Sequence, residues 1–77
     1  MKRERLVLEA VTDAGSRGIK GRRLVDESYG VLKLSTIYVY LDRLEAKGLI
    51  RVNDDGPRPV FFATNAGREL VNQQWRA

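Results

Sequence analysis

One helix-forming stretch near the middle of the chain limits the fold more than any other part of the sequence. In "LSTIYVYLDRLEAKGLI", residues 34 to 50, Ile37, Leu41 and Leu44 recur at the i, i+4, i+7 spacing of one helical face. The Ser35 hydroxyl can accept a backbone hydrogen bond where this helix opens, and Gly48 can end it. Because β-prone residues follow Gly48 at once, the sequence predicts a short core-forming helix that leads directly into a β element.

The β element is predicted to be an antiparallel hairpin. "LIRVN" and "VFFAT" are rich in β-branched and aromatic residues, and "DDGPRP" between them is a Gly/Pro turn cluster. Pro59 is confined to a strand start or an edge. Thr64 can then cap a last helix, "NAGRELVNQQWRA", whose apolar stripe comprises Ala66, Leu70, Val71 and Trp75.

Two more helices are predicted ahead of residue 34. The first spans Lys2 to Ala14 and ends at Gly15, with its core face formed by Leu6, Val7, Ala10, Val11 and Ala14. Leu8 points about 200° away from Leu6, so it is expected on the outer face. After a loop, "GSRGIKG", the stretch "RRLVDESY" has the composition of a short second helix that stops at Gly30.

The order helix, helix, helix, hairpin, helix predicts a winged helix-turn-helix: mainly α, with a small β-hairpin as the wing. The 77 residues suffice for one such domain, residues 1–77, and no internal repeat or linker interrupts it. Because this scaffold also serves as a protein-docking module, function has to be inferred from its surface.

The composition argues against an enzyme and against a metal site. The chain has no Cys and no His, so it lacks disulfides, thiolate ligands and the commonest general base. Asp54 and Asp55 are adjacent in a turn, which suits a solvated turn better than an acid/base pair. We therefore expect no catalytic residues, no cofactor and no metal.

The sequence also predicts a cytoplasmic protein without a membrane segment. No apolar run approaches the roughly 20 residues of a membrane span. Glu4 and Glu9 stand where a signal peptide would need an uninterrupted apolar region.

Positive charge is concentrated where it could hold a nucleic acid. The net charge is +4 and the pI is near 9.9. A stretch without acidic residues carries Arg17, Lys20, Arg22 and Arg23 at the entry to the second helix, where they could grip phosphates with the help of the helix dipole. Lys33 extends this patch, and Arg58 is the only cation expected in the wing. The alternative is a solvated basic face without a specific partner.

The outward side of the helix after Leu34 is expected to be small and sparsely charged, which permits close approach to base edges. Ser35 and Thr36 can donate or accept hydrogen bonds, Val39 can touch a thymine methyl group, and Arg43 can reach a guanine or a phosphate. The Tyr38 hydroxyl can donate to a phosphate. The alternative for Tyr38 and for Tyr40 is a half-buried ring that fills space, and for Tyr40 this alternative is the preferred one.

Residues 34 to 70 resemble the PadR family of winged-helix transcriptional regulators. The matching residues are Thr36, Ile37, Tyr38, Leu41, Arg43, Leu44, Glu45, Gly48, Leu49, Ile50, Phe62, Thr64 and Gly67. "TIY" together with "TNAG" favours this family over MarR-like relatives. The resemblance implies a DNA-binding repressor, usually dimeric and often responsive to a ligand.

Several residues depart from the family pattern. Val39 replaces the usual Pro, Ser35 stands where Gly is frequent, and Lys20 precedes Gly21 where a capping Ser or Thr is common. Asp42 occupies a position that is commonly basic or polar, so it weakens or redirects a DNA contact. The family normally continues past the position of Ala77 into a long dimerisation helix, so the associated ligand pocket is expected to be largely missing here.

The leading hypothesis is therefore a sequence-specific regulator of double-stranded DNA, a repressor that binds a palindromic operator as a homodimer. Leu8, Val71 and Trp75 are the predicted dimer contacts, with packing inside one chain as the alternative for Val71 and Trp75. The second hypothesis is a winged-helix adaptor that docks a protein partner, supported by Asp42, Asp54 and Asp55 on the presumed DNA side. The sequence does not indicate an effector.

Overall fold

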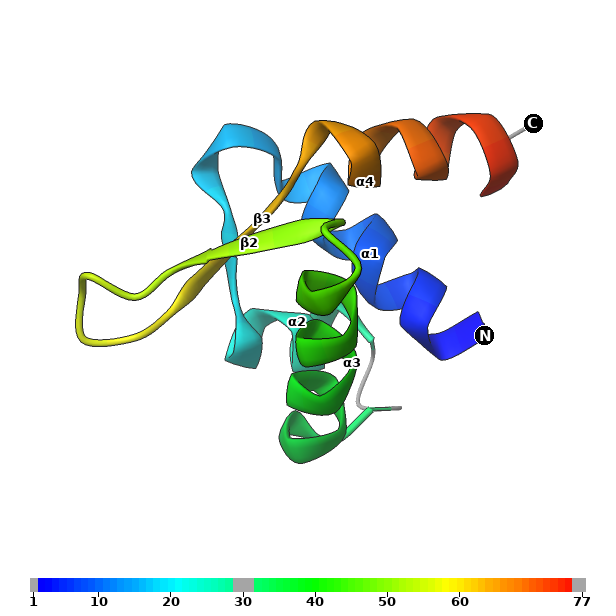
Figure 1. Ribbon diagram of the computed structural model, residues 1–77. Helices are drawn as coiled ribbons and strands as arrows, with labels where there is room; N and C mark the ends of the chain where they lie inside the picture. The colour runs from blue at the N-terminus through cyan, green and yellow to red at the C-terminus, as the bar shows by residue number, and fades with distance from the viewer. Residues whose placement is uncertain (1, 29–31, 76–77) are drawn as a thin grey trace.

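The computed structural model describes residues 2–28 and 32–75, and it has the winged-helix order that the sequence predicts (Figure 1). The elements in chain order are α1 (Lys2–Ala14), the 3-10 turn η1 (Gly15–Arg17), β1 (Ile19–Lys20), α2 (Gly21–Glu27), α3 (Leu34–Ala46), β2 (Ile50–Asn53), β3 (Val60–Ala63), α4 (Asn65–Leu70) and the π-helical turn η2 (Val71–Trp75). The three helices α1 to α3 pack together, and the hairpin of β2 and β3, the wing, projects away from them on the left of Figure 1.

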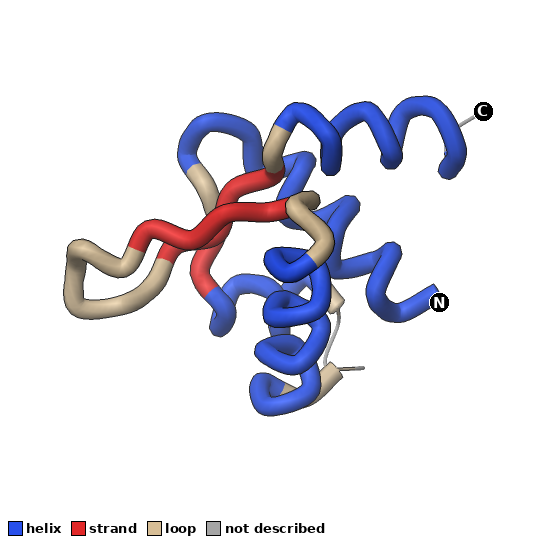
Figure 2. Tube along the Cα trace, in the orientation of Figure 1, coloured by secondary structure: helices blue, strands red, loops and turns tan. Residues whose placement is uncertain are grey.

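The sheet has three strands rather than the two that the sequence predicts. Its order is β1-β3-β2, and both pairs are antiparallel, with Ile19 opposite Phe61 and Ile50 opposite Ala63 (Figure 2). The expectation that "GSRGIKG" is only a loop is therefore wrong. A two-residue strand has no periodicity of its own, and it forms here because β3 offers it a free edge.

Gly18 explains why β1 can lie so close to β3. Its φ is +72°, and a Cβ at this position would lie 2.5 Å from Val60 Cγ1 and 2.6 Å from Phe62 Cε2. Only a residue without a side chain fits between the turn and these two side chains of β3. The glycine thus brings the start of α2 next to the wing.

The ends of α3 differ in how well the sequence predicts them. Its C-terminus is confirmed: Gly48, at φ +75°, donates to the Glu45 carbonyl, and Leu49 donates to the Leu44 carbonyl, which is a Schellman motif. The predicted N-terminus is wrong. The helix begins at Leu34, its N-cap residue is Lys33, and no side chain among the described residues caps it. Ser35 is already inside the helix and exposed, so the predicted Ser35 cap is wrong.

Thr64 caps α4 as the sequence predicts. Its hydroxyl accepts a hydrogen bond from the Gly67 N–H at 3.1 Å and donates one to the Gly48 carbonyl at 2.7 Å. The same side chain thus joins the end of α3 to the start of α4. The predicted second helix is confirmed over Gly21–Glu27, and its expected stop at Gly30 lies outside the described residues.

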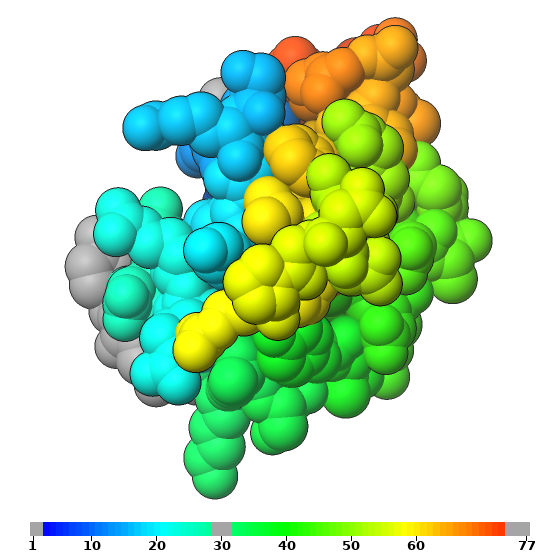
Figure 3. All heavy atoms as spheres, turned by 90° about the vertical axis from the view of Figure 1, so that its left-hand side faces the viewer, coloured from blue at the N-terminus to red at the C-terminus, as the bar shows by residue number. Residues whose placement is uncertain are grey.

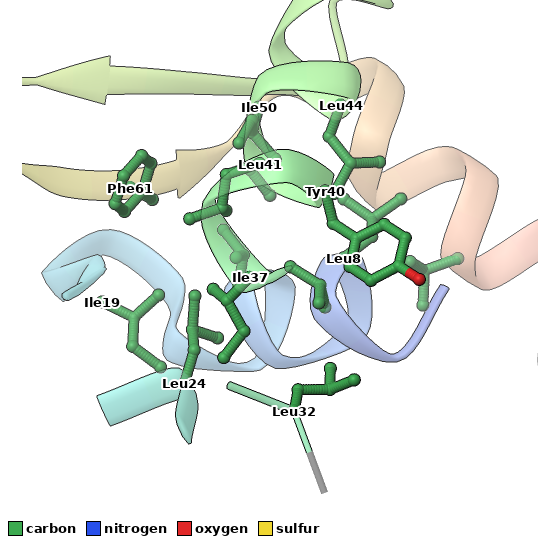
Figure 4. Close-up of a cluster of buried hydrophobic side chains, with 14 residues drawn as sticks. Leu8, Ile19, Leu24, Leu32, Ile37, Tyr40, Leu41, Leu44, Ile50 and Phe61 are labelled. Atoms are coloured by element: carbon green, nitrogen blue, oxygen red, sulfur yellow. The ribbon is translucent and has the colours of Figure 1, made fainter. Parts of the chain in front are cut away.

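One hydrophobic core joins the helices to the inner face of the sheet. Figure 4 shows Leu8 of α1, Ile37 and Leu41 of α3, and Phe61 of β3 among its members. The α3 residues predicted to face inward are all buried. The opposite face of α3 is thereby left exposed.

The burial of Leu8 and Val71 contradicts the predicted dimer surface. Both side chains are 0% exposed, so the expectation that Leu8 lies on an outer face is wrong, and for Val71 the alternative of packing inside the chain holds. The reason is that α4 and η2 cross over α1 and bury a second side of it, as Figure 2 shows at the top of the molecule. Leu6, which was expected in the core, is 53% exposed instead. The side chain of Trp75 lies outside the described residues.

Candidate nucleic-acid interface

The outer side of α3 forms a narrow exposed line of short side chains, which we name the reading face: Ser35, Val39, Asp42 and Ala46. These residues follow an i, i+4, i+7, i+11 spacing, so they stack along one side of the helix opposite the buried Ile37 and Leu41. All four are exposed, and Val39 has 48% of its surface accessible. Because none of them is longer than a valine or an aspartate, the helix backbone can come close to a ligand surface.

A basic groove lies beside the reading face. It has a volume of about 390 Å³ and is lined by Lys20, Gly21, Arg22, Arg23, Asp26, Leu34, Tyr38, Arg58 and Pro59. The cations come from β1, from α2 and from the turn of the wing. Figure 3 shows the yellow end of the wing directly beside the cyan start of α2 and the green α3. The fold therefore gathers four of the cations that the sequence analysis selected, including the distant Arg58, around one depression.

Tyr38 connects the groove to the reading face. Its ring lies 6.1 Å from the Phe61 ring, centroid to centroid, and the residue is 37% exposed. A Cβ on Gly21 would lie 2.9 Å from the Tyr38 hydroxyl, so the phenol rests against the first residue of α2. Tyr38 thus packs against the scaffold and also lines the groove, and the contact of its hydroxyl with a phosphate stays a prediction.

Tyr40 has a purely structural position, as the preferred interpretation of the sequence holds. It is 7% exposed and belongs to the core cluster. The Arg43 guanidinium carbon lies 5.7 Å from the centroid of the Tyr40 ring, within the range of a cation–π contact. Arg43 therefore lies on the flank of α3 that faces away from Tyr38, with an exposed side chain.

The same flank is tied to α1 by an ion pair. The Lys47 ammonium lies 2.7 Å from the Glu4 carboxylate, and Lys47 is exposed while the Glu4 side chain is mostly covered. This pair links the C-terminal end of α3 to the N-terminal half of α1 at the surface, beside the core contacts that orient the two helices.

The remaining predicted residues lie around these two features. Lys33 is exposed at the start of α3, Ser35 is exposed in its first turn, and Thr36 is half-buried on the side of Tyr40. Arg17 is not in the basic groove: it lines an adjoining hollow of about 500 Å³ together with Asp13 and Glu27, and Arg23 lines both depressions. Proximity in sequence to Lys20 therefore does not bring Arg17 into the basic groove.

Arg51 is a cation of the wing that the sequence analysis missed. It pairs in register with Phe62, and its guanidinium carbon lies 4.6 Å from the centroid of the Phe62 ring. The alternation of strand residues could have revealed it: Ile50 is buried, so the next residue must face outward. The expectation that Arg58 is the only wing cation is wrong.

The described residues contain neither a metal-binding cluster nor a membrane-spanning helix. Across residues 2–28 and 32–75, no cluster of three or more His, Cys, Asp or Glu side chains is arranged to hold a metal ion. In the same part of the chain, no helix combines the length and the apolar character needed to cross a membrane.

Comparison with known proteins identifies the fold. No family model matches the sequence, and no curated protein matches it. Among solved structures, the chain is similar to a PadR family transcription regulator from hypervirulent Clostridium difficile, with a TM-score of 0.68 at 24% identity, over 95% of this chain and 85% of that one. The predicted winged-helix fold, and the likeness to PadR proteins at the level of the fold, are confirmed.

Proposed function

We propose that this chain is a PadR-like transcriptional regulator that binds double-stranded DNA in a sequence-specific manner. In this proposal α3 enters the major groove, and its reading face lies against base edges. The basic groove takes the phosphates at the side of α3. The observation that carries the proposal is a slim, exposed face of α3 with a four-cation groove on the neighbouring flank of the same helix, where Tyr38 lies.

The charges of the basic groove support duplex DNA as the ligand. Arg22 and Arg23 are exposed at the start of α2, and Arg58 approaches from the wing. Cations that flank a recognition helix on one side can contact consecutive phosphates of one strand, which fixes the register of the helix in the groove. Asp26 is the acidic residue in the lining, and four cations outweigh it.

We further propose that the protein acts as a homodimer on a palindromic operator and represses by occupying a promoter in the cytoplasm. One recognition helix contacts only a few base pairs, so useful discrimination against a genome requires two copies. Because Leu8 and Val71 are buried in the core, the contacts between the two copies must come from other surfaces. The similarity in fold to a solved PadR family transcription regulator supports a regulatory role by analogy.

The decisive experiment is selection of bound duplexes from a random pool, with the mass of the complex measured by light scattering. We expect enrichment of a motif with two inverted half-sites and a complex that contains two chains. Failure to enrich any duplex would overturn the proposal and favour the protein-docking alternative. Enrichment of a single half-site by one chain would overturn the homodimer while leaving DNA binding intact.

A charge reversal in the groove provides a sharper test. Arg22→Glu is expected to weaken binding to every duplex by about 10-fold or more, because it removes one phosphate contact and adds a repulsive charge. The matched control is Arg17→Glu, which changes the net charge by the same amount. Because Arg17 lines the neighbouring hollow and not the basic groove, this substitution should weaken binding much less. Fluorescence anisotropy with a labelled duplex measures both. Equal losses for the two variants would show that only net charge matters and that the groove is not a contact.

A further inference from the structure

We propose that Asp42 selects cytosine at one position of each half-site by accepting a hydrogen bond from the exocyclic amino group of that base. The inference rests on the proposed DNA-binding function. It concerns the one acidic side chain among the four residues of the reading face.

The position of Asp42 carries its carboxylate into any groove that α3 enters. It lies three residues after Val39 and four before Ala46, at the middle of the exposed line opposite Leu41 and Leu44. Its neighbours on the line are small, so no longer side chain holds the helix away from the bases. Three residues of helix rise about 4.5 Å, so Asp42 and Val39 face the same or adjacent base pairs.

No partner for this carboxylate is found in the part of the protein that the structure describes. Within residues 2–28 and 32–75, Asp42 takes part in no hydrogen bond and no ion pair. The two cations nearest to it in sequence have other partners, since Arg43 lies over the Tyr40 ring and Lys47 binds Glu4. A carboxylate without a donor is costly between two rows of phosphates, because it loses water and meets like charge. The donor must therefore come from the DNA.

The major groove offers two such donors, and their surroundings distinguish them. The adenine amino group lies between two acceptors, adenine N7 and thymine O4, and both repel a carboxylate. The cytosine amino group has an acceptor, guanine O6, on one side only, and the C5–H edge of cytosine on the other. A single carboxylate approaching from the helix is therefore better accommodated by cytosine.

The first test compares duplex selection by the wild type, Asp42→Asn and Asp42→Ala. The wild type is expected to enrich cytosine at one position of the half-site, with a loss of affinity of about 10-fold for the other bases there. Asp42→Asn should shift that position to adenine, because an amide can pair with both N6 and N7. Asp42→Ala should lose the preference at that position and keep the rest of the motif. The side chain is exposed on a helix surface, so both variants should fold, which circular dichroism checks.

The second test changes the DNA instead of the protein. A duplex that carries N4-methylcytosine at the selected position keeps the pair with guanine but loses the amino hydrogen exposed in the major groove. It should bind the wild type about 10-fold less tightly than the normal duplex does, and the loss should be much smaller for Asp42→Ala. The matched control variant is Asp26→Asn, which removes an acid from the basic groove. It should raise the affinity for all duplexes without altering any base preference.

The possible failures are distinguishable. If the Asp42 variants select the same motif as the wild type with equal strength at every position, the cytosine contact is wrong while DNA binding stands. If the wild type enriches no duplex at all, the proposed function fails and the cytosine contact fails with it.

Discussion

The side chains of α3 show how one short helix serves both a core and a surface. Tyr40 and Tyr38 are two residues apart and therefore lie on different sides of the helix. Tyr40 is enclosed in the core, whereas Tyr38 lines the basic groove with its hydroxyl against Gly21. The periodicity of the aliphatic residues predicted the buried position of Tyr40, because it places Tyr40 beside the buried stripe, whereas it left both alternatives open for Tyr38 on the flank.

At the residue scale, Gly18 is expected to tolerate no side chain without a clear loss of stability. Gly18→Ala should lower the free energy of unfolding by about 3 kcal/mol, because it places a Cβ at positive φ and against Val60 and Phe62. Urea denaturation followed by circular dichroism measures the change.

Gly56→Ala is the matched control for this substitution. Gly56 lies in the turn of the wing, and no neighbouring atom lies within 4 Å of the position that a Cβ would take there. Its replacement should therefore change the free energy of unfolding by less than about 0.5 kcal/mol. Equal effects of the two substitutions would contradict the close approach of Gly18 to β3.

At the scale of the elements, the helix ends follow from local chemistry that can be read in a few adjacent residues. Gly48 and Thr64 were both predicted in their roles, since a Schellman motif and an N-cap depend on residues within one turn. β1 was not predicted, because its two residues are extended only through pairing with Phe61 and Val60, which lie much further along the chain.

Thr64 is expected to stabilise two elements at once. Thr64→Ala removes the acceptor for the Gly67 N–H and the donor to the Gly48 carbonyl, and should lower the free energy of unfolding by about 1 to 2 kcal/mol. Thr64→Ser keeps the hydroxyl and should retain most of this stability. Thermal or urea unfolding compares the variants, and an equal loss for Ser and Ala would show that the hydroxyl contributes nothing.

At the scale of the whole molecule, the candidate interface depends on segments that are far apart in the sequence. Lys20, Leu34 and Arg58 meet at one groove, although α2 separates the first two along the chain and β2 lies between the last two. Local patterns identified each cation separately, and only the tertiary structure shows that Lys20, Arg22, Arg23 and Arg58 line the same groove.

The proposed interface predicts a steep dependence of DNA affinity on salt. If about four to six phosphates are neutralised, affinity should fall by about two to three decades between 50 and 200 mM monovalent salt. Titrations of a labelled duplex at several salt concentrations provide the slope. A flat response would contradict a phosphate-binding role for the basic groove.

The sequence alone determined the order of the helices and the hairpin, the inward face of α3, and the caps at Gly48 and Thr64, because each depends on periodicity or turn chemistry within a short window. Only the tertiary structure decided which sides of α1 are buried, that Ile19 and Lys20 form a strand, and that Arg58 joins Arg22 and Arg23. These features arise from contacts between distant segments. Leu8 became a core residue because α4 and η2 cover a second side of α1, which no pattern within α1 could indicate.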